Sequence, residues 1–570
     1  MSLTALARVA GQTAGMIADH PTVAAIADRY VEELCALEPI SATFLGVAGY
    51  DNELGDLSPA GVVATEALLR RTLADLAAAT ASTDRERTAS ALMRERLGLE
   101  LERCEAGLPY GNLNVLASGP QAVRGVFDLM PTGTPEQRAV LADRMAAVPA
   151  ALAGLAETYR EGVRRGVVPA RRQVVEVAAQ CRRWAGSPAP GFFSALVGPL
   201  DGDGLAGPAA AADQAYGSLA RHLEDELAPA ASEDDAVGPD RYPLEARVFT
   251  GAQLDLAETY AWGWEELARI EVEKAAVAAS IVPGGSMADA TAALNAQPER
   301  IVHGADGLQA WMQELSDHAV AALNGTHFDI PASISSLRCA IAPPGGPAVA
   351  YYTGPSEDLS RPGTMWWSLA PGQEDFSTWQ EVTTVYHEGV PGHHLQVAQV
   401  ALNAANLTRF QRIACFVSGH GEGWALYAER LMDELGFLED PGNRLGMLDA
   451  QALRATRVVL DIGAHLRLPV PPNPFGWREG EGWTAASMRE LLAAHTLLDP
   501  AYVADEVNRY LGWPGQAISY KVGERVWLQA RADARRRQGD AFDLKAFHAA
   551  ALDLGPLGLD QLRTEMARLG

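Results

Sequence analysis

Apolar residues recur at the spacing of an α-helix along most of this chain, and this pattern limits its fold more than any other feature. In Thr22–Leu37, for example, Val23, Ile26, Tyr30 and Leu34 lie three or four positions apart, so a helix would place them on one face. The same spacing recurs in five further segments: Ser58–Ala78, Arg85–Leu108, Pro135–Arg165, Gln253–Ile281 and Ala305–Leu323. We therefore predict a mainly α-helical protein.

One stretch between residues 330 and 370 departs from the helical pattern. It contains three short β-prone runs, Ser335–Ala342, Ala348–Thr353 and Gly363–Leu369. Runs of this length, separated by turn residues, predict a small antiparallel β-sheet within a helical protein. The sheet would lie next to the helix that carries the histidines described below.

Charge and cysteine content exclude several classes of partner. Acidic residues outnumber basic ones by 72 to 46, and the formal net charge is -26, so we expect neither nucleic acid nor an anionic membrane as a partner. The five cysteines are far apart and form no C-x-x-C pair, which argues against a disulfide framework and a thiolate zinc site. Met1–His20 lacks the compact apolar segment of a secretory signal. We therefore expect a cytoplasmic protein.

The segment Val385–Gln396, with the sequence VYHEGVPGHHLQ, contains three of the chain's twelve histidines. In zinc peptidases with an H-E-x-x-H motif, two histidines one helical turn apart bind the metal. The glutamate after the first histidine takes a proton from the attacking water. His387 and Glu388 match the start of this motif, but Pro391 occupies the position of the second histidine.

Two later histidines could replace the missing ligand. His393 and His394 follow His387 by six and seven positions, which a regular helix would place about 120° around its axis or about 10 Å further along it. Pro391 has no N–H for the carbonyl oxygen of His387, and its ring clashes there. A kink or bulge, eased by Gly392, could bring His393 to the place of the second ligand. His394 is the alternative.

A third ligand is expected in the segment Ser418–Arg430, with the sequence SGHGEGWALYAER. Glu422 lies 29 positions after His393, which is enough for a helix, a turn and a returning helix. Glu429 is two turns further on the same helical face, where it could hydrogen-bond to a metal ligand. His420 is a second candidate for such a supporting role, or for contact with a substrate.

Taken together, these motifs resemble a bacterial family of unknown function numbered 885. The matching segments, in the same order, are Pro39–Ser58, then HEGVPGHHLQ, GEGWALYAE and PGQAISYKVG, so the resemblance spans nearly the whole chain. Members are similar to gluzincin peptidases such as angiotensin-converting enzyme, thimet oligopeptidase and the Taq-type carboxypeptidases. The resemblance implies one large helical unit with two lobes around a deep cleft, here residues 1–240 and 241–570.

The resemblance also implies roles for individual residues. The G-H of the gluzincin motif matches Gly392 and His393, which favours His393 over His394 as the metal ligand. Tyr520 would donate a hydrogen bond to the developing oxyanion, and its alternative role is that of an ordinary half-buried aromatic. His465, which matches a D-x-G-x-H element of the family, would line the cleft, unless it is a core histidine.

Two basic side chains are candidates for binding a substrate carboxylate. Arg361 precedes the β-prone run Gly363–Leu369, whose edge could pair with an extended peptide. Its guanidinium could then bind the carboxylate through two hydrogen bonds. Lys521 follows Tyr520 and would either bind such a carboxylate or face solvent.

We therefore predict a hydrolase of peptide bonds, acting on short peptides, in which Zn²⁺ is bound by His387, His393 and Glu422. Glu388 would be the general base. Manganese and iron are alternative metals. A metal-dependent amidohydrolase of a non-peptide small metabolite is the alternative enzyme, and a non-catalytic binding protein is the alternative from another class. We expect a monomer or a homodimer.

Overall fold

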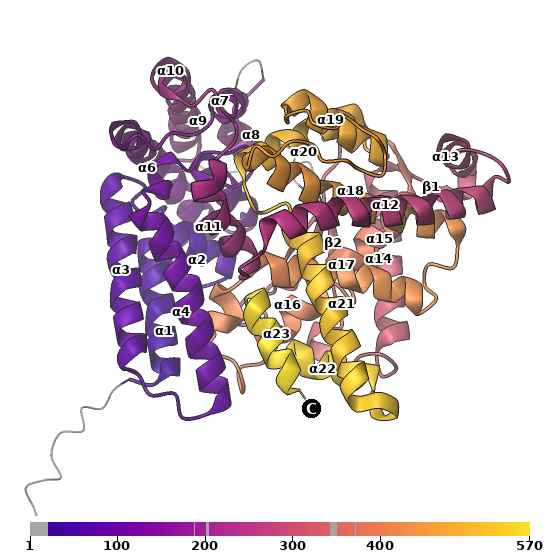
Figure 1. Ribbon diagram of the computed structural model, residues 1–570. Coiled ribbons are helices and arrows are strands. Elements are labelled where there is room, and N and C mark those ends of the chain that lie inside the picture. The colour runs from indigo at the N-terminus through magenta and orange to yellow at the C-terminus, as the bar shows by residue number, and fades with distance from the viewer. Residues whose placement is uncertain (1–20, 187–188, 201–203, 343–349, 371, 570) are drawn as a thin grey trace, which may run out of the picture.

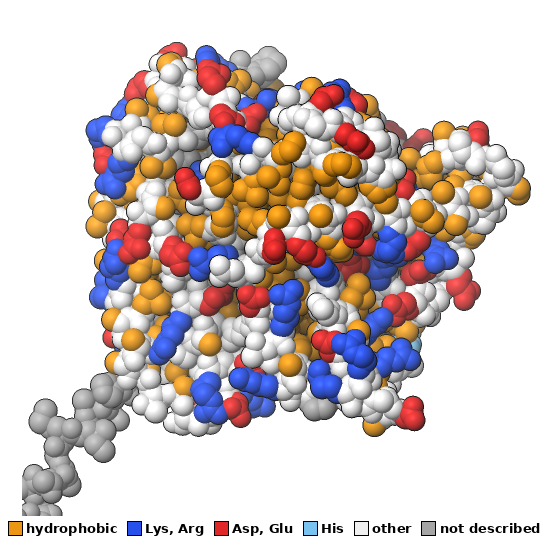
Figure 2. All heavy atoms as spheres, viewed as in Figure 1, with side chains coloured by type: hydrophobic (Ala, Val, Ile, Leu, Met, Phe, Trp, Pro, Cys, Tyr) orange, Lys and Arg blue, Asp and Glu red, His pale blue; other side chains and the backbone are white. Residues whose placement is uncertain are grey.

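The computed structural model describes residues 21–186, 189–200, 204–342, 350–370 and 372–569. Helices make up 68% of the chain and strands 4%, which confirms the predicted mainly helical fold with small sheets. The predictions for Met1–His20 and for the first two residues of Ala348–Thr353 lie outside the described residues. On the face shown in Figure 2, charged side chains of both signs are widely spread, and hydrophobic side chains gather across the middle.

The first part of the chain forms a group of helices on one side of the molecule (Figure 1). Side chains cap two of them, because Thr22 accepts a hydrogen bond from the N–H of Ala25 and Ser58 accepts one from that of Ala60. The helices are α1 (Val23–Leu37), α2 (Pro39–Leu45), α3 (Pro59–Ala78), α4 (Asp84–Glu105), α5 (Gly119–Gly125), α6 (Pro135–Arg165), α7 (Arg171–Trp184), α8 (Phe192–Val197), α9 (Ala206–His222) and α10 (Ala228–Ala230).

Helix α6 has the length and hydropathy of a membrane span, and among the described helices it is the one that does. Its face with Leu141, Met145, Val148 and Leu152 is buried, and it packs against α9. This packing is what a core helix of a folded protein requires. The helix continues through Pro149 without a break.

The rest of the chain contains the other helices and all described strands. The helices are α11 (Gly238–Thr250), α12 (Leu256–Ile281), α13 (Met287–Asn295), α14 (Gly304–Leu323), α15 (Thr378–Glu388), α16 (His393–Leu402), α17 (Ser418–Glu434), α18 (Pro441–His465), α19 (Ala485–His495), α20 (Pro500–Gly512), α21 (Ser519–Gln538), α22 (Leu544–Asp553) and α23 (Leu559–Arg568). The strands are β1 (Ile301–His303), β2 (Arg338–Ile341), β3 (Tyr351–Thr353), β4 (Thr364–Trp367) and β5 (Asp375–Ser377).

Two large apolar clusters form the core. One joins side chains of α6, α7 and α9 and lies within residues 40–228. The other joins side chains of α1, α3 and α4 with those of α12, α17, α18 and α21. The first helices therefore share a core with the second half of the chain. The boundary between lobes at residue 240 stays a prediction.

The three predicted β-prone runs contain β2, β3 and β4, which form a sheet in the order β2-β4-β3. Strands β3 and β4 are antiparallel as predicted, but β2 and β4 are parallel, so the sheet is mixed. The chain reverses between β2 and β3 and again between β3 and β4, and β4 takes the central position. A second pair, β1 with β5, is antiparallel. Sequence reasoning missed it because each strand has only three residues.

Candidate metal centre

The helix that carries His387 breaks where Pro391 predicts. Helix α15 ends at Glu388, and α16 begins at His393. In the short connection the Val390–Pro391 peptide bond is cis, and the N–H of Gly392 donates to the carbonyl oxygen of Tyr386 at 3.1 Å. A Cβ on Gly392 would lie 1.9 Å from the carbonyl oxygen of His387, so only glycine fits this turn.

Helix α17 holds this connection in place and presents Glu422 to it. The indole N–H of Trp424 donates to the carbonyl oxygen of Pro391 at 2.9 Å. On another face, α17 packs closely on α21, since a Cβ on Gly523 would lie 2.6 Å from the Cα of Gly423. The glycines of the two motifs therefore allow a close helix crossing, which brings the start of α21 near Glu422.

The carboxylate of Glu422 faces both His387 and His393. The Oε2 atom of Glu422 lies 3.3 Å from Nε2 of His387 and 3.3 Å from Nε2 of His393, and the two imidazole rings are 4.8 Å apart at 87°. Ligand atoms about 2.0–2.1 Å from a tetrahedral zinc lie about 3.3 Å from one another. The separations from Glu422 to the two imidazoles therefore fit a shared zinc ion.

A second carboxylate adjoins the two imidazoles. Glu388 offers an oxygen that, with one nitrogen each of His387 and His393, forms a group of atoms all within 4.8 Å of one another. Among the described residues, none hydrogen-bonds to the Glu388 carboxylate. Burial raises the pKa of Glu388, and the charges of His393 and His387 offset this only in part.

The other ring nitrogen of His387 is held by a buried carboxylate. Nδ1 of His387 lies 2.7 Å from Oε1 of Glu429, which is fully buried, and Oε2 of Glu429 accepts a hydrogen bond from Thr383 at 2.6 Å. With the proton on Nδ1, the lone pair on Nε2 is free to bind a metal. Burial alone would lower the pKa of His387, but the hydrogen bonds with Glu422 and Glu429 raise it to about 9.

Tyr520, at the start of α21, lies beside His387. Their rings are nearly parallel, with centroids 6.4 Å apart, and the guanidinium of Arg457 lies over the tyrosine ring at 4.7 Å. Gln516 donates to the Tyr520 hydroxyl at 3.5 Å. Arg457 is itself fixed by an ion pair with Glu506 at 2.6 Å. These contacts orient Tyr520 toward the two imidazoles.

Two other candidate histidines point elsewhere. Nε2 of His394 donates to the carbonyl oxygen of Ile334 at 2.9 Å, and its Nδ1 lies 3.0 Å from the Tyr352 hydroxyl. Both nitrogens are therefore used to hold α16 against the sheet. His420 accepts a hydrogen bond from the N–H of Leu557 at 2.7 Å, and burial lowers its pKa to about 4. It supports the packing of α17 rather than the metal ligands.

His465 and Lys521 are also engaged within the core. His465 is fully buried, and its Nε2 donates to the carbonyl oxygen of Tyr510 at 3.0 Å. The ammonium group of Lys521 donates to Glu266, Gln451 and Glu524 at 2.9, 2.5 and 2.5 Å. All three of its protons have acceptors, so it has none left for a substrate carboxylate.

Arg361 lies in the loop between β3 and β4. One of its terminal nitrogens approaches Gly46 of α2's C-terminus, at 3.3 Å from the position of a Cβ there. Its backbone N–H donates to the hydroxyl of Ser356 at 2.9 Å, and burial lowers the pKa of its guanidinium. Arg361 therefore lies where the loop meets α2. Its described contacts are with that region and not with His387 or His393.

Several residues of the site were not assigned a role from the sequence. Trp424 and Gln516 stand inside the recognised motifs, but their partners Pro391 and Tyr520 were not predictable from spacing. The sequence weakly indicates that Arg457 has a structural role, because an arginine in the apolar run LRATRVVLDIG needs a buried partner. A further residue, Phe416, is 56% exposed, and its ring lies 6.3 Å from that of His393.

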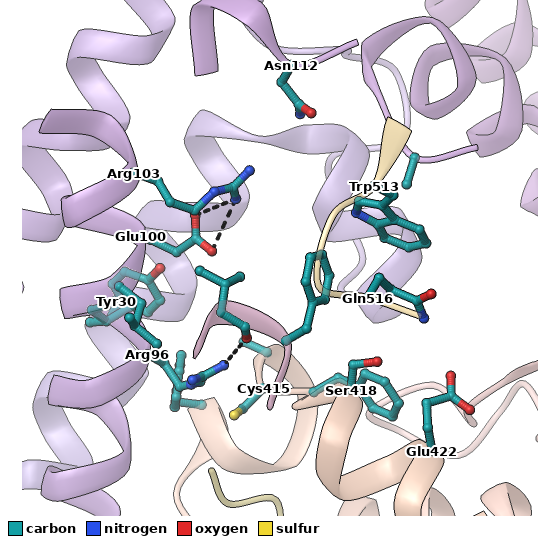
Figure 3. A pocket seen from close by; sticks show the side chains of 18 residues that line it. Tyr30, Arg96, Glu100, Arg103, Asn112, Cys415, Ser418, Glu422, Trp513 and Gln516 are labelled. Carbon is teal, nitrogen blue, oxygen red and sulfur yellow. Dashed lines mark hydrogen bonds and ion pairs between the residues drawn. The ribbon is translucent and has the colours of Figure 1, made fainter. Parts of the chain in front are cut away.

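A cavity of about 460 Å³ opens beside Glu422. It is lined by residues of α4, of the end of α11, of the start of α17 and of the 513–516 segment, and Figure 3 shows Glu422 at one edge of it with Gln516 nearby. A volume of this size is typical of a site for a small ligand. Of the candidate metal ligands, Glu422 is the one that lines this cavity.

Fold and site together define a mainly helical protein with a candidate metal centre of two histidines and glutamates. The chain belongs to the family described as bacterial protein of unknown function (DUF885), which matches residues 39–566. This confirms the family predicted from the motifs. No curated protein matches the chain.

Two solved structures share the fold. A candidate lipoprotein from Colwellia psychrerythraea is 23% identical, with a TM-score of 0.81 over 96% of this chain and 98% of that one. A candidate lipoprotein of unknown function from Shewanella oneidensis is 17% identical, with a TM-score of 0.69 over 96% of this chain and 100% of that one. At these identities the likeness shows the fold alone.

The prediction of a cytoplasmic protein is wrong, because both structural neighbours are described as candidate lipoproteins. The prediction rested on Met1–His20, which lies outside the described residues, and on the cysteines. All five cysteines are free, and Cys35, Cys181 and Cys339 are buried. Buried thiols stay free in any compartment, so they carry no information about location.

Proposed function

We propose that this protein is a zinc-dependent hydrolase that cleaves peptide bonds in short peptides. One observation carries the proposal: Oε2 of Glu422 lies 3.3 Å from Nε2 of both His387 and His393. The His387–Glu422 contact of 3.3 Å is long for a charge-assisted hydrogen bond, which is typically about 2.7–2.9 Å, and it matches the edge of about 3.3 Å in a tetrahedron of zinc ligands. The resemblance of the H-E pair and the later glutamate helix to gluzincin peptidases supports the same function.

The residues fit zinc by their chemistry. Two imidazoles and one carboxylate are a known ligand set of catalytic zinc, and they leave a position for a water or substrate. Glu429 and Thr383 form the carboxylate support that metal-binding histidines commonly have. When bound, zinc supplies Lewis-acid chemistry, which lowers the pKa of water and polarises a carbonyl group. Manganese and iron are the alternatives.

Glu388 is the general base in this proposal. Its carboxylate accepts the proton of the attacking water and then returns it to the nitrogen of the leaving amine. The raised pKa of Glu388 suits this double role, because a carboxylate with a pKa nearer neutrality takes a proton from water more readily than one of ordinary pKa and can still return it to the leaving amine. Tyr520 donates its hydroxyl proton in a hydrogen bond to the oxygen that gains charge.

Activity on a mixed peptide library tests the proposal. The zinc-loaded protein should cleave peptides, and Glu388→Gln should lower kcat by about 100- to 10,000-fold while the zinc content is unchanged. Glu381→Gln is the matched control, because Glu381 lies two turns earlier in the same helix, and it should keep full activity. Full activity of Glu388→Gln would rule out Glu388 as the general base. Cleavage of small non-peptide amides alone would favour the alternative amidohydrolase.

A further inference from the structure

The cavity beside Glu422 carries information about the substrate. Most of its wall is apolar, and the rings of five aromatic residues line it: Tyr30, Phe249, Phe410, Phe416 and Trp513. Aromatic rings in the wall of a pocket offer contacts to an apolar ligand group, and its polar groups fix the ligand's orientation. Because the cavity reaches a proposed metal ligand, a group bound in it would lie next to the reacting bond.

Among the aromatic residues of the cavity, Phe416 is the one that packs against a proposed metal ligand. It stands just before α17, is 56% exposed, and its ring lies edge-to-face with that of His393 at 6.3 Å. A Cβ on Gly421 would lie 2.5 Å from the Phe416 ring, so the ring rests on the first turn of α17. Because Phe416 is exposed and also lines the cavity, its ring is available for contact with a bound apolar group.

A second aromatic wall comes from two further residues of the cavity. Phe249, at the end of α11, packs edge-to-face against Trp513, with ring centroids 5.4 Å apart. Both side chains are half-buried. A planar or branched apolar group between this pair and Phe416 would gain contacts with aromatic faces and edges, which favour such packing.

The charged groups of the cavity are neutralised within the protein. Arg96 pairs with Glu95 and donates to the carbonyl oxygen of Val248 at 2.7 Å, and Arg103 donates to Glu100 at 3.1 Å. Figure 3 shows the Arg103–Glu100 pair on the side of the N-terminal helices, away from Glu422. Neither arginine is therefore available as a strong site for a substrate carboxylate.

From these observations we propose that the cavity is a specificity pocket, which binds an aromatic or large aliphatic side chain next to the scissile bond. The substrate class is then short peptides with such a residue beside the cleaved amide. This inference rests on the proposed function, because the cavity is placed relative to the proposed metal ligand. Phe416 is the residue that decides the preference.

Binding to an inactive variant tests the pocket separately from catalysis. Zinc-loaded Glu388→Gln would be titrated in a calorimeter with two peptides that differ only in having phenylalanine or serine at one position, scanned in turn along the peptide. At one position phenylalanine should bind at least 10-fold more tightly, within the roughly 10- to 200-fold range of apolar pockets. Phe416→Ala in the same background should reduce this ratio about 10-fold, and Phe416→Leu should keep most of it.

Phe44→Ala is the matched control, since Phe44 is also an exposed phenylalanine (46% exposed) but does not line the cavity. It should leave the binding ratio unchanged. Three outcomes would contradict the proposed specificity pocket: equal binding of the two peptides, no binding of either, or a preference that persists in Phe416→Ala. If phenylalanine is preferred but the wild-type protein cleaves no peptide, the proposed hydrolase function is rejected and the proposed binding pocket is kept. If peptides are cleaved without preference, only the pocket fails.

Discussion

His387 and His465 are both buried histidines at the C-terminal ends of helices, yet their surroundings differ. Nε2 of His387 faces Glu422, and its Nδ1 faces Glu429 at 2.7 Å. Nε2 of His465 donates to the carbonyl oxygen of Tyr510, and its Nδ1 accepts from the N–H of Val237. One imidazole hydrogen-bonds to two carboxylates, whereas the other hydrogen-bonds to backbone groups, with the carboxylate of Asp461 further off at 3.7 Å.

The difference separates a structural histidine from a candidate ligand. Burial lowers the pKa of His465 to about 4, so this ring stays neutral and completes a pair of core hydrogen bonds. At His387 the two carboxylates outweigh burial and raise the pKa to about 9. Because anionic groups stabilise a positive charge, the region of His387 suits a bound cation and the region of His465 does not.

The largest expected effect comes from removing each imidazole in turn. His387→Ala should weaken zinc binding by about 1000-fold, since one ligand contributes roughly a quarter to a third of the about 10–16 kcal/mol of a zinc site. His465→Ala should leave zinc affinity unchanged but lower the free energy of unfolding by about 2–4 kcal/mol, through lost hydrogen bonds and a cavity. Competition with a chromogenic chelator and urea unfolding measure the two quantities. If the two variants bound zinc with equal affinity, His387 would not differ from His465 as a metal ligand.

A pair of tyrosines extends the comparison to catalysis. Tyr520→Phe should lower kcat roughly 100-fold, with zinc content unchanged, because it removes the hydroxyl proposed to stabilise the oxyanion. Tyr510 belongs to the region of His465, and its hydroxyl bonds to Arg457 and Glu506. Tyr510→Phe should mainly reduce stability, by about 1–3 kcal/mol. A Tyr520→Phe enzyme with normal kcat would remove Tyr520 from the mechanism.

The low pKa of His465 predicts a pH dependence of stability. Its pKa is about 4 in the folded protein and about 6.5 in the unfolded chain. Its contribution is therefore fully present above pH 6.5 and lost as the pH falls from 6.5 to 4, by on the order of 3 kcal/mol. Burial raises the pKa of Asp461 to about 7. This carboxyl therefore makes the folded protein more stable as the pH falls through the same range, opposite to the effect of His465.

Comparison with His465→Gln isolates this contribution, because Asp461 is present in both proteins. Urea unfolding from pH 4 to 8 should show a stability difference between wild type and variant that shrinks as the pH falls. A difference that stays constant over this range would mean that His465 does not titrate as a buried neutral imidazole.

The smallest effect is expected from the carboxylate behind His387. Glu429→Gln keeps the shape of the side chain but removes its charge, so zinc affinity should fall about 10-fold. Glu506→Gln is the matched control, since Glu506 is a buried carboxylate paired with Arg457, and it should lower stability without changing zinc affinity. Similar zinc affinities for wild type and Glu429→Gln would show that the support of His387 is unimportant.

Local features of the fold were predictable from the sequence. The helices α1 and α3 followed from the spacing of apolar residues, because helical periodicity acts within a few residues. The helix break at Pro391 followed for the same reason, since the clash of proline with the preceding turn is local. Glu422 was a reasonable candidate because the distance along the chain suits two antiparallel helices.

Contacts between distant segments were not predictable. His465 was assigned to the cleft from a D-x-G-x-H pattern, but its partners Val237 and Tyr510 are 228 and 45 positions away. Likewise, the choice between His393 and His394 depends on the backbone angles of the four residues before them. The aromatic cavity draws on α4, α11 and α17, so no single segment of the sequence indicates it.

Zinc binding to the wild-type protein tests the central claim most directly. X-ray absorption on the protein loaded with one equivalent of zinc should show two imidazole ligands and a carboxylate oxygen at about 2.0–2.2 Å, with the imidazole contribution reduced in His387→Ala and unchanged in His465→Ala. Zinc that fails to bind stoichiometrically, or that binds with no imidazole ligand, would contradict the account.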